Sequence, residues 1–154
     1  MAPLGFDPHD HDDCIRDAVA AAQARCDARG LQLTPVRRRV LEILLHRHRA
    51  VGAYEILDTL RAEGLGSQPP VAYRALDFLT KHGLAHRIER LNAFVACTHP
   101  QAQHDPAFLI CRACEAVAET DADLGEMATK GGFQAEQTVV EIEGLCPRCQ
   151  KDRP

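Results

Sequence analysis

Aromatic residues are scarce in this chain, which has five Phe, two Tyr and no Trp in 154 residues. Its cores must therefore be filled mainly by aliphatic side chains. The sequence lacks an apolar run of about 20 residues, the length that a membrane-spanning helix needs. Its polar start, "MAPLGFDPHDHDD", lacks the basic and apolar regions of a signal peptide. P-loop, G-x-S-x-G and G-x-G-x-x-G motifs are absent as well. We therefore expect a cytoplasmic protein with no membrane partner, no small-molecule substrate and no catalytic activity.

Positive charge is concentrated in one part of the chain, although the net charge is −4. Residues 25–90 carry 12 Lys and Arg against 7 Asp and Glu, a net of +5, and the remaining residues have a net of −9. Such asymmetry predicts a basic module that meets a polyanion such as DNA, beside an acidic module with another role. An uneven but merely solvated surface is the alternative that charge alone leaves open.

Helical periodicity and helix-end signals recur before residue 84. Thr34 can cap a helix that Pro35 opens, and Gly30 and Gly83 follow predicted helices as glycine caps do. The period then changes to that of strands on either side of a turn near Asn92. Helices followed by a small hairpin predict a winged helix-turn-helix, whose last helix enters the major groove of DNA. The predicted helices span 14–30, 34–48, 53–64 and 67–83, and the predicted strands span 84–89 and 93–97.

The composition divides the chain into four segments. Residues 1–13 are predicted to be disordered, 14–97 to form the winged-helix DNA-binding domain, and 98–107 to form a linker or hinge. Residues 108–154 form a small α+β unit, which buries too little apolar surface to be very stable alone and needs a staple or a partner. Within that unit we expect a helix near 121–130 and a long strand over 133–146.

Two Cys-x-x-Cys pairs supply such a staple. Each pair puts two thiolates on one tight turn, and two such turns make the four soft ligands of a closed tetrahedral zinc site. The odd total of seven cysteines, in a chain without an export signal, also favours metal over disulfides. Because four protein ligands leave no position for water, this site predicts structural zinc and not catalysis. The pairs are Cys111 with Cys114 and Cys146 with Cys149.

A further cysteine, Cys97, ends the hairpin on the strand opposite His86. Together with His104 of the linker and Glu119 beyond it, these residues would provide two nitrogens, one thiolate and one carboxylate, a set that suits zinc. Spacing alone leaves the alternative open, because a lone strand cysteine is more often a small buried apolar residue. His99, two residues from Cys97, could compete with His104 as a ligand.

Three stretches of the sequence resemble the ferric uptake regulator family of metal-sensing bacterial repressors: "LTPVRRRVLEIL", "PPVAYRALDFL" and the paired Cys-x-x-Cys motifs. Within that family the chain most resembles the zinc uptake regulator branch, from about residue 31 to residue 149. The resemblance implies an α+β fold in which a winged-helix domain joins a small α/β dimerisation domain, here 108–154, with a four-cysteine zinc site. It also implies a homodimer that carries two zinc ions per chain and represses zinc-uptake genes at palindromic operator DNA when zinc-loaded.

The resemblance also implies roles for single residues. Arginine suits base recognition because its fork can bond two acceptors on one guanine. Regulatory ligands that come from the wing, the linker and the second domain would let zinc fix the angle between the two domains. The implied DNA contacts are Tyr54, Tyr73 and Arg74. The implied ligands are His86, Cys97, His104 and Glu119 for the regulatory zinc, and Cys111, Cys114, Cys146 and Cys149 for the structural zinc.

Three other functions compete with this hypothesis. An iron- or peroxide-responsive regulator of the same family is disfavoured because Cys97 is a soft thiolate, and iron in this family sits among harder ligands. A zinc enzyme is disfavoured because four protein ligands leave no open position. A zinc-stapled interaction module without DNA is disfavoured by the basic segment and its order of helices.

Overall fold

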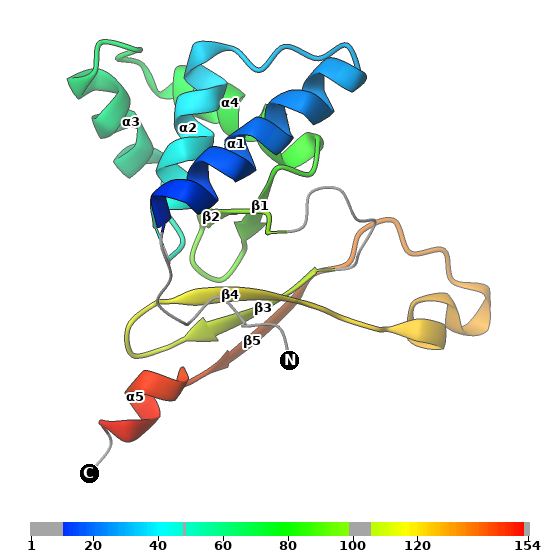
Figure 1. Ribbon diagram of the computed structural model, residues 1–154. Coiled ribbons are helices and arrows are strands. Elements are labelled where there is room, and N and C mark those ends of the chain that lie inside the picture. Colours follow the sequence, from blue (N-terminus) through cyan, green and yellow to red (C-terminus); the bar gives the residue numbers. More distant parts are fainter. Residues whose placement is uncertain (1–10, 48, 99–105, 153–154) are drawn as a thin grey trace.

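The structure is a computed structural model that describes residues 11–47, 49–98 and 106–152. A helical part with a small hairpin lies above a second part built on one sheet (Figure 1). This is the predicted α+β fold class, which the structure confirms. In the described part of the chain, no helix is both long and apolar enough to cross a membrane.

The first part has the element order of a winged helix-turn-helix. Its two strands form an antiparallel hairpin, the wing, in which His86 pairs with Val95. The residues between the strands form a turn in which Asn92 has a positive φ of 46°. The elements are α1 (His11–Ala28), α2 (Pro35–His46), α3 (Ala53–Ala62), α4 (Pro69–Lys81), β1 (Ala85–Ile88) and β2 (Ala93–Ala96).

Local signals in the sequence set the ends of these helices. The Thr34 hydroxyl accepts a hydrogen bond from the Arg37 N–H at 3.3 Å and Pro35 follows at the first helical position, so the predicted cap of α2 is confirmed. After α1, Gly30 takes a positive φ of 68°, and the Leu31 N–H returns to the Cys26 carbonyl. Gly83 ends α4 in the same way, with φ of 72°.

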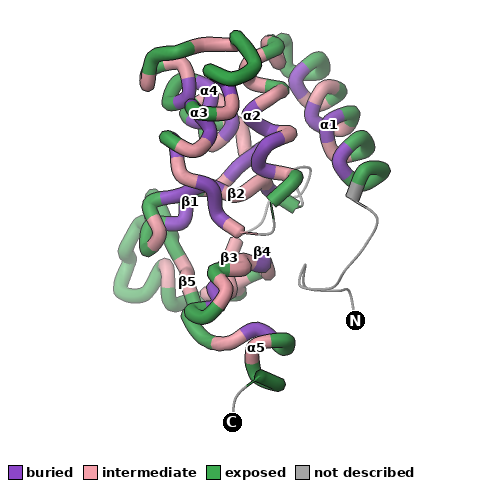
Figure 2. Tube along the Cα trace, turned by 90° about the vertical axis from the view of Figure 1, so that its left-hand side faces the viewer, coloured by how far each residue is buried: buried purple, intermediate pink, exposed green. Residues whose placement is uncertain are grey.

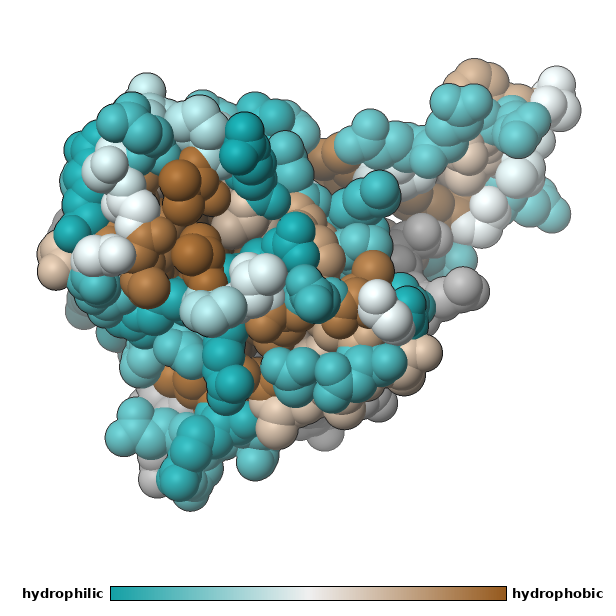
Figure 3. Space-filling model, turned by 90° about the horizontal axis from the view of Figure 1, so that it is seen from above, coloured by the Kyte–Doolittle hydropathy of each residue, from teal (hydrophilic) through white to brown (hydrophobic). Residues whose placement is uncertain are grey.

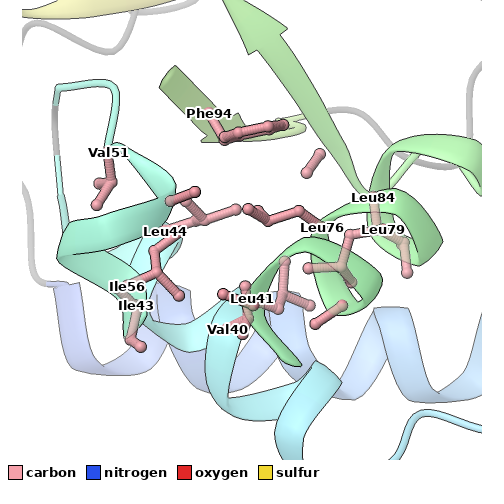
Figure 4. Close-up of a cluster of buried hydrophobic side chains, with 14 of the residues drawn as sticks. Val40, Leu41, Ile43, Leu44, Val51, Ile56, Leu76, Leu79, Leu84 and Phe94 are labelled. Atoms are coloured by element: carbon pink, nitrogen blue, oxygen red, sulfur yellow. The ribbon is translucent and has the colours of Figure 1, made fainter. Parts of the chain in front are cut away.

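An aliphatic core joins α2, α3, α4 and the base of the wing (Figure 4). Its side chains come from the positions where apolar residues recur at helical spacing, and burying each one contributes about 1.5–3 kcal/mol. The scarcity of aromatic residues is visible in this core, where Phe94 is the aromatic side chain among the labelled ones. Those labelled are Val40, Leu41, Ile43, Leu44, Val51, Ile56, Leu76, Leu79, Leu84 and Phe94.

The second part is a three-stranded sheet in the order β4-β3-β5. Its central strand pairs antiparallel with β4 and parallel with β5. A short helix follows the last strand of the sheet. The segment before that strand, which includes a 3-10 helix, extends away from the rest of the chain (orange in Figure 1, and to the right in Figure 3). The elements are β3 (Pro106–Cys111), β4 (Val117–Asp121), η1 (Gly125–Gly132), β5 (Val140–Gly144) and α5 (Pro147–Lys151).

Some predicted boundaries were wrong. The strand expected over 133–146 covers only Val140–Gly144, because Ala107 pairs with Val140 and β3 begins one residue earlier, at Pro106. The helix expected near 121–130 is instead the 3-10 helix Gly125–Gly132, interrupted at Lys130 and Gly131. Pro106 and Ala107, placed in the linker, belong to β3, and residues 11–13, placed in the disordered segment, are helical. Residues 1–10 and 99–105 lie outside the described residues.

A small apolar cluster joins the two parts. Ile88 and Ala93 of the wing pack with Phe108 and Ile110 of β3, together with Ala50 between α2 and α3. Figure 2 shows the sheet directly beneath the hairpin. The wing therefore rests on one face of the sheet, and residues of both parts meet there.

Candidate metal centres

Two tight turns of the second part bring four cysteines together. Cys111 ends β3, and Cys146 precedes Pro147 at the first position of α5. The four sulfur atoms all lie within 4.8 Å of one another, and the Sγ atoms of Cys114 and Cys146 are 3.8 Å apart. The predicted pairing of Cys111 and Cys114 with Cys146 and Cys149 is therefore present as one cluster, of the composition that binds structural zinc.

The pKa values of the cysteines in this cluster are shifted in opposite directions, as expected for thiols that share a site built for a cation. Burial opposes ionisation of Cys111, but backbone N–H groups, that of Cys146 foremost, favour its thiolate, and the pKa falls to about 6. Hydrogen bonding to the Cys146 sulfur, followed by burial, instead raises the pKa of Cys149 to about 12. Four thiols this close cannot all ionise without a compensating positive charge, which bound zinc would supply.

A second cluster lies where the two parts meet. His86 comes from β1, Cys97 follows β2 and Glu119 lies on β4, and one donor atom from each lies within 4.8 Å of the others. The Glu119 Oε1 atom is 3.5 Å from His86 Nε2 and 3.7 Å from Cys97 Sγ. The structure thus brings together one nitrogen, one sulfur and one carboxylate oxygen from two domains.

Burial makes this cluster unusual. The Glu119 side chain is 3% exposed and Cys97 is 7% exposed. Glu119 is the one buried charged residue in the described part of the chain, and a buried carboxylate is costly unless its charge is compensated. A divalent cation among these donors would compensate it, so the donor set fits a zinc ion. His104, the predicted fourth ligand, and its competitor His99 lie outside the described residues.

Thr98 is part of this site, although no motif or spacing in the sequence predicts it. Its backbone N–H donates to Glu119 Oε2 at 3.0 Å, and its hydroxyl lies 3.2 Å from the same oxygen. These contacts orient the carboxylate so that Oε1 faces His86 and Cys97. Groups that hold a ligand in this way tune metal affinity.

The three residues expected to contact DNA lie on the surface of the winged-helix part. Tyr54, at the start of α3, is 67% exposed, and Tyr73 on α4 is 43% exposed. Arg74, next to Tyr73, is exposed as well. One side of α4 therefore packs into the core, where Ala72 is 1% exposed, and the opposite side faces solvent.

The three consecutive arginines of α2 differ in how strongly other side chains hold their guanidinium groups. Arg39 is held by Glu63, with N–O distances of 2.7 to 3.0 Å, and this bond raises the pKa of its guanidinium. Arg37 lies over the Phe78 ring, 3.9 Å from its centre. Arg38 is exposed and has a longer contact, 3.5 Å, to Glu42.

Polar contacts between the wing and β5 were also missed by sequence reasoning. The Glu141 carboxylate accepts hydrogen bonds from the backbone N–H groups of Glu89 and Arg90, and Arg90 Nε lies 2.6 Å from Glu143 Oε2. The alternation of Val140 and Ile142 with these glutamates predicts a strand with one polar face. It does not reveal what that face meets, because the partner lies about 50 residues away.

A winged-helix fold that carries two clusters of metal-binding side chains, one of them shared between two domains, defines a metal-binding protein of the winged-helix class. The sequence profile of the Ferric uptake regulator family matches residues 28–143. The zinc uptake regulation protein of Escherichia coli strain K12 is 37% identical over 140 residues, which cover 87% of this chain and 82% of that protein. The chain belongs to the ferric uptake regulator family, as its motifs predicted.

Solved structures extend the likeness to three dimensions. A zinc uptake regulator complexed with zinc and DNA matches with a TM-score of 0.84 and 36% identity, over 90% of this chain and 96% of that chain. The holo form of XcZur matches with a TM-score of 0.79 and 41% identity, over 88% and 98% of the two chains. Its apo form gives a TM-score of only 0.53, at 43% identity over 90% and 99%. The overall arrangement of this chain is therefore closer to the holo form than to the apo form.

Proposed function

We propose that this protein is a zinc-responsive transcriptional repressor, which binds palindromic operator DNA as a homodimer when zinc-loaded and controls zinc-uptake genes. The observation that carries the proposal is the cluster of His86, Cys97 and Glu119, whose members come from two domains. A regulator of this kind works in the compartment that holds the DNA, and it has no need of a catalytic group. Relatives at 37% identity that bear the name zinc uptake regulation protein support the assignment.

The regulatory site joins the wing to the second domain. Zinc, when bound, supplies a cation that His86, Cys97 and Glu119 can share, with His104 as the fourth ligand. Thr98 holds the Glu119 carboxylate in place through its N–H and hydroxyl. The wing and the sheet then move as one body, and the conformational freedom that DNA binding would otherwise remove is already lost.

The four-cysteine site has a separate role. Its ligands all belong to the second domain, so metal there stabilises that domain and does not restrict the angle between the two domains. Two zinc ions per chain are therefore expected, one structural and one regulatory. A thiolate at position 97 favours zinc over iron in the regulatory site.

Dimerisation is supported by apolar side chains that this single chain leaves in solvent. In the second domain, Met127 is 75% exposed, Phe133 68%, Val139 51% and Ile142 52%. Figure 3 shows the segment that carries the first three projecting from the rest of the chain, where a second chain can pack on it. A two-fold dimer presents two copies of α4, with Tyr73 and Arg74, to the two halves of a palindrome.

Operator binding measured against buffered free metal tests the proposal. The operator is first selected by the wild-type protein from genomic fragments of its own organism, in the presence of zinc. We expect specific binding to rise with free zinc and not with iron or manganese. Binding that is equal with and without zinc, or that follows iron or manganese instead, would contradict the proposal.

A further inference from the structure

The sheet of the second domain presents two rows of side chains to the wing. Across the order β4-β3-β5, the register places Glu119, Phe108 and Glu141 side by side in one row. The adjacent row on the same face consists of Val117, Ile110 and Glu143. Neighbours across a sheet share a face, as do residues two apart on one strand, so all six side chains point to the same side.

Each edge of this face holds the wing by different chemistry. At the β4 edge, Glu119 meets His86 and Cys97. In the middle, Phe108 and Ile110 pack against Ile88 and Ala93. The remaining edge is β5, where Glu141 and Glu143 contact the wing directly through a hydrogen bond and an ion pair.

At the β5 edge one carboxylate engages the backbone of the wing turn. Glu141 Oε1 accepts from the Glu89 N–H at 2.5 Å, and Oε2 accepts from the Arg90 N–H at 3.1 Å. Glu143 adds an ion pair, with its Oε2 2.6 Å from Arg90 Nε. Backbone donors are already ordered by the turn, so the first contact immobilises one side chain, whereas an ordinary surface ion pair immobilises two.

We propose that Glu141 and Glu143 form a metal-independent clasp that holds the tip of the wing on β5. The regulatory cluster and this clasp then fasten the two domains at opposite edges of one sheet face. The regulatory meaning of the clasp rests on the proposed function. The clasp favours the docked arrangement at every zinc concentration, so it lowers the amount of zinc needed to populate that arrangement.

The double variant Glu141→Gln with Glu143→Gln tests the clasp, and Asp17→Asn with Asp152→Asn removes the same charge from exposed positions outside both the clasp and the apolar segment proposed for the dimer. Half-maximal operator binding by the clasp variant should need about 3- to 10-fold more free zinc, as expected for partly exposed charge-assisted contacts. At saturating zinc its operator affinity should equal that of the wild type, because bound metal then holds the wing on the sheet without help from the clasp. The control variant should keep the wild-type zinc midpoint.

Amide hydrogen exchange in the zinc-depleted full-length protein gives a readout that needs no DNA. The N–H groups of Glu89 and Arg90 should exchange about 3- to 10-fold faster in the clasp variant, because their acceptor is weakened. An unchanged zinc midpoint together with unchanged exchange would overturn the inference. So would a loss of affinity at saturating zinc with no shift of the midpoint, since the clasp would then not act through docking. If the wild type itself shows no zinc-dependent operator binding, the proposed function fails, while exchange still decides the clasp.

Discussion

The two clusters of metal-binding side chains in this chain differ in how their residues are brought together. The four-cysteine cluster is made by two turns of one domain, each with its pair three residues apart. The cluster of His86, Cys97 and Glu119 draws on both domains and depends on how the wing sits on the sheet. A site within one domain can stabilise that domain, whereas a site shared between two domains can make their arrangement depend on whether the metal is present. Under the proposed function, one site thus binds zinc to stabilise the fold and the other binds zinc to control DNA binding.

Loss of the four-cysteine site should give the largest effect. In Cys114→Ser the second domain loses a thiolate, and binding of structural zinc accounts for about 10–16 kcal/mol in comparable small domains. We expect one zinc fewer per chain, an early melting transition and loss of the dimer, while α1 to α4 keep their helical signal. Zinc analysis, circular dichroism and sedimentation check this. A variant that stays dimeric with an unchanged melting curve would show that the cluster is not a structural centre.

Loss of the shared site should separate sensing from folding. A hydroxyl is a much poorer zinc ligand than a thiolate, so Cys97→Ser should weaken zinc at this site by more than about 100-fold. The four-cysteine site should stay filled, and operator binding should no longer rise with zinc. Were Cys97 only a buried core thiol, serine would lower stability by about 1–3 kcal/mol and leave the zinc response intact. A thermal melt beside a zinc-titrated binding curve distinguishes these outcomes.

A variant of the DNA surface should leave both metal sites alone. Arg74→Ala on the exposed side of α4 should weaken operator binding by about 1–3 kcal/mol, with zinc content and dimerisation unchanged. Binding isotherms for the selected operator and for a scrambled one measure the effect. Equal affinity of variant and wild type for the operator would mean that Arg74 makes no base contact.

The smallest effect should come from the support of Glu119. Thr98→Val removes the hydroxyl contact to Oε2 but keeps the backbone N–H contact. We expect zinc at the shared site to weaken by about 3- to 10-fold, less than the roughly 10- to 100-fold that loss of a whole supporting group costs, because the backbone contact remains. The four-cysteine site should not respond. Competition with a zinc chelator measures both sites, and an equal loss at both would deny that Thr98 acts on the shared site.

The elements that depend on local sequence could be predicted well. Thr34 and Pro35 mark the start of α2, and Gly30 and Gly83 mark helix ends, because caps depend only on neighbouring residues. The four-cysteine cluster was predictable for the same reason, since the geometry of each pair is built into one turn. The strand expected over 133–146 failed because pairing needs a neighbouring strand, and β3 extends only to Pro106.

Contacts between the domains could not be derived from the residues alone. Spacing could not decide whether Cys97 is a ligand or a buried thiol, and only the family resemblance favoured a ligand. Thr98 and the pair Glu141 and Glu143 had no signal, because their partners are set by the angle between two domains. The likeness to XcZur also differs between its holo and apo forms, with TM-scores of 0.79 and 0.53.

Stepwise removal of zinc, with operator binding measured at each step, is the most direct test of the two roles. It asks whether zinc at the four-cysteine site stabilises the fold while zinc at the shared site controls DNA binding. The wild-type protein is titrated with a chelator of graded strength while zinc content, oligomeric state and operator affinity are recorded on the same sample. We predict close to two zinc ions per chain at the start and loss of operator binding with the first to leave. The dimer and its helical signal should persist until the second leaves. A single zinc per chain, lost in one step together with the fold, would contradict the account.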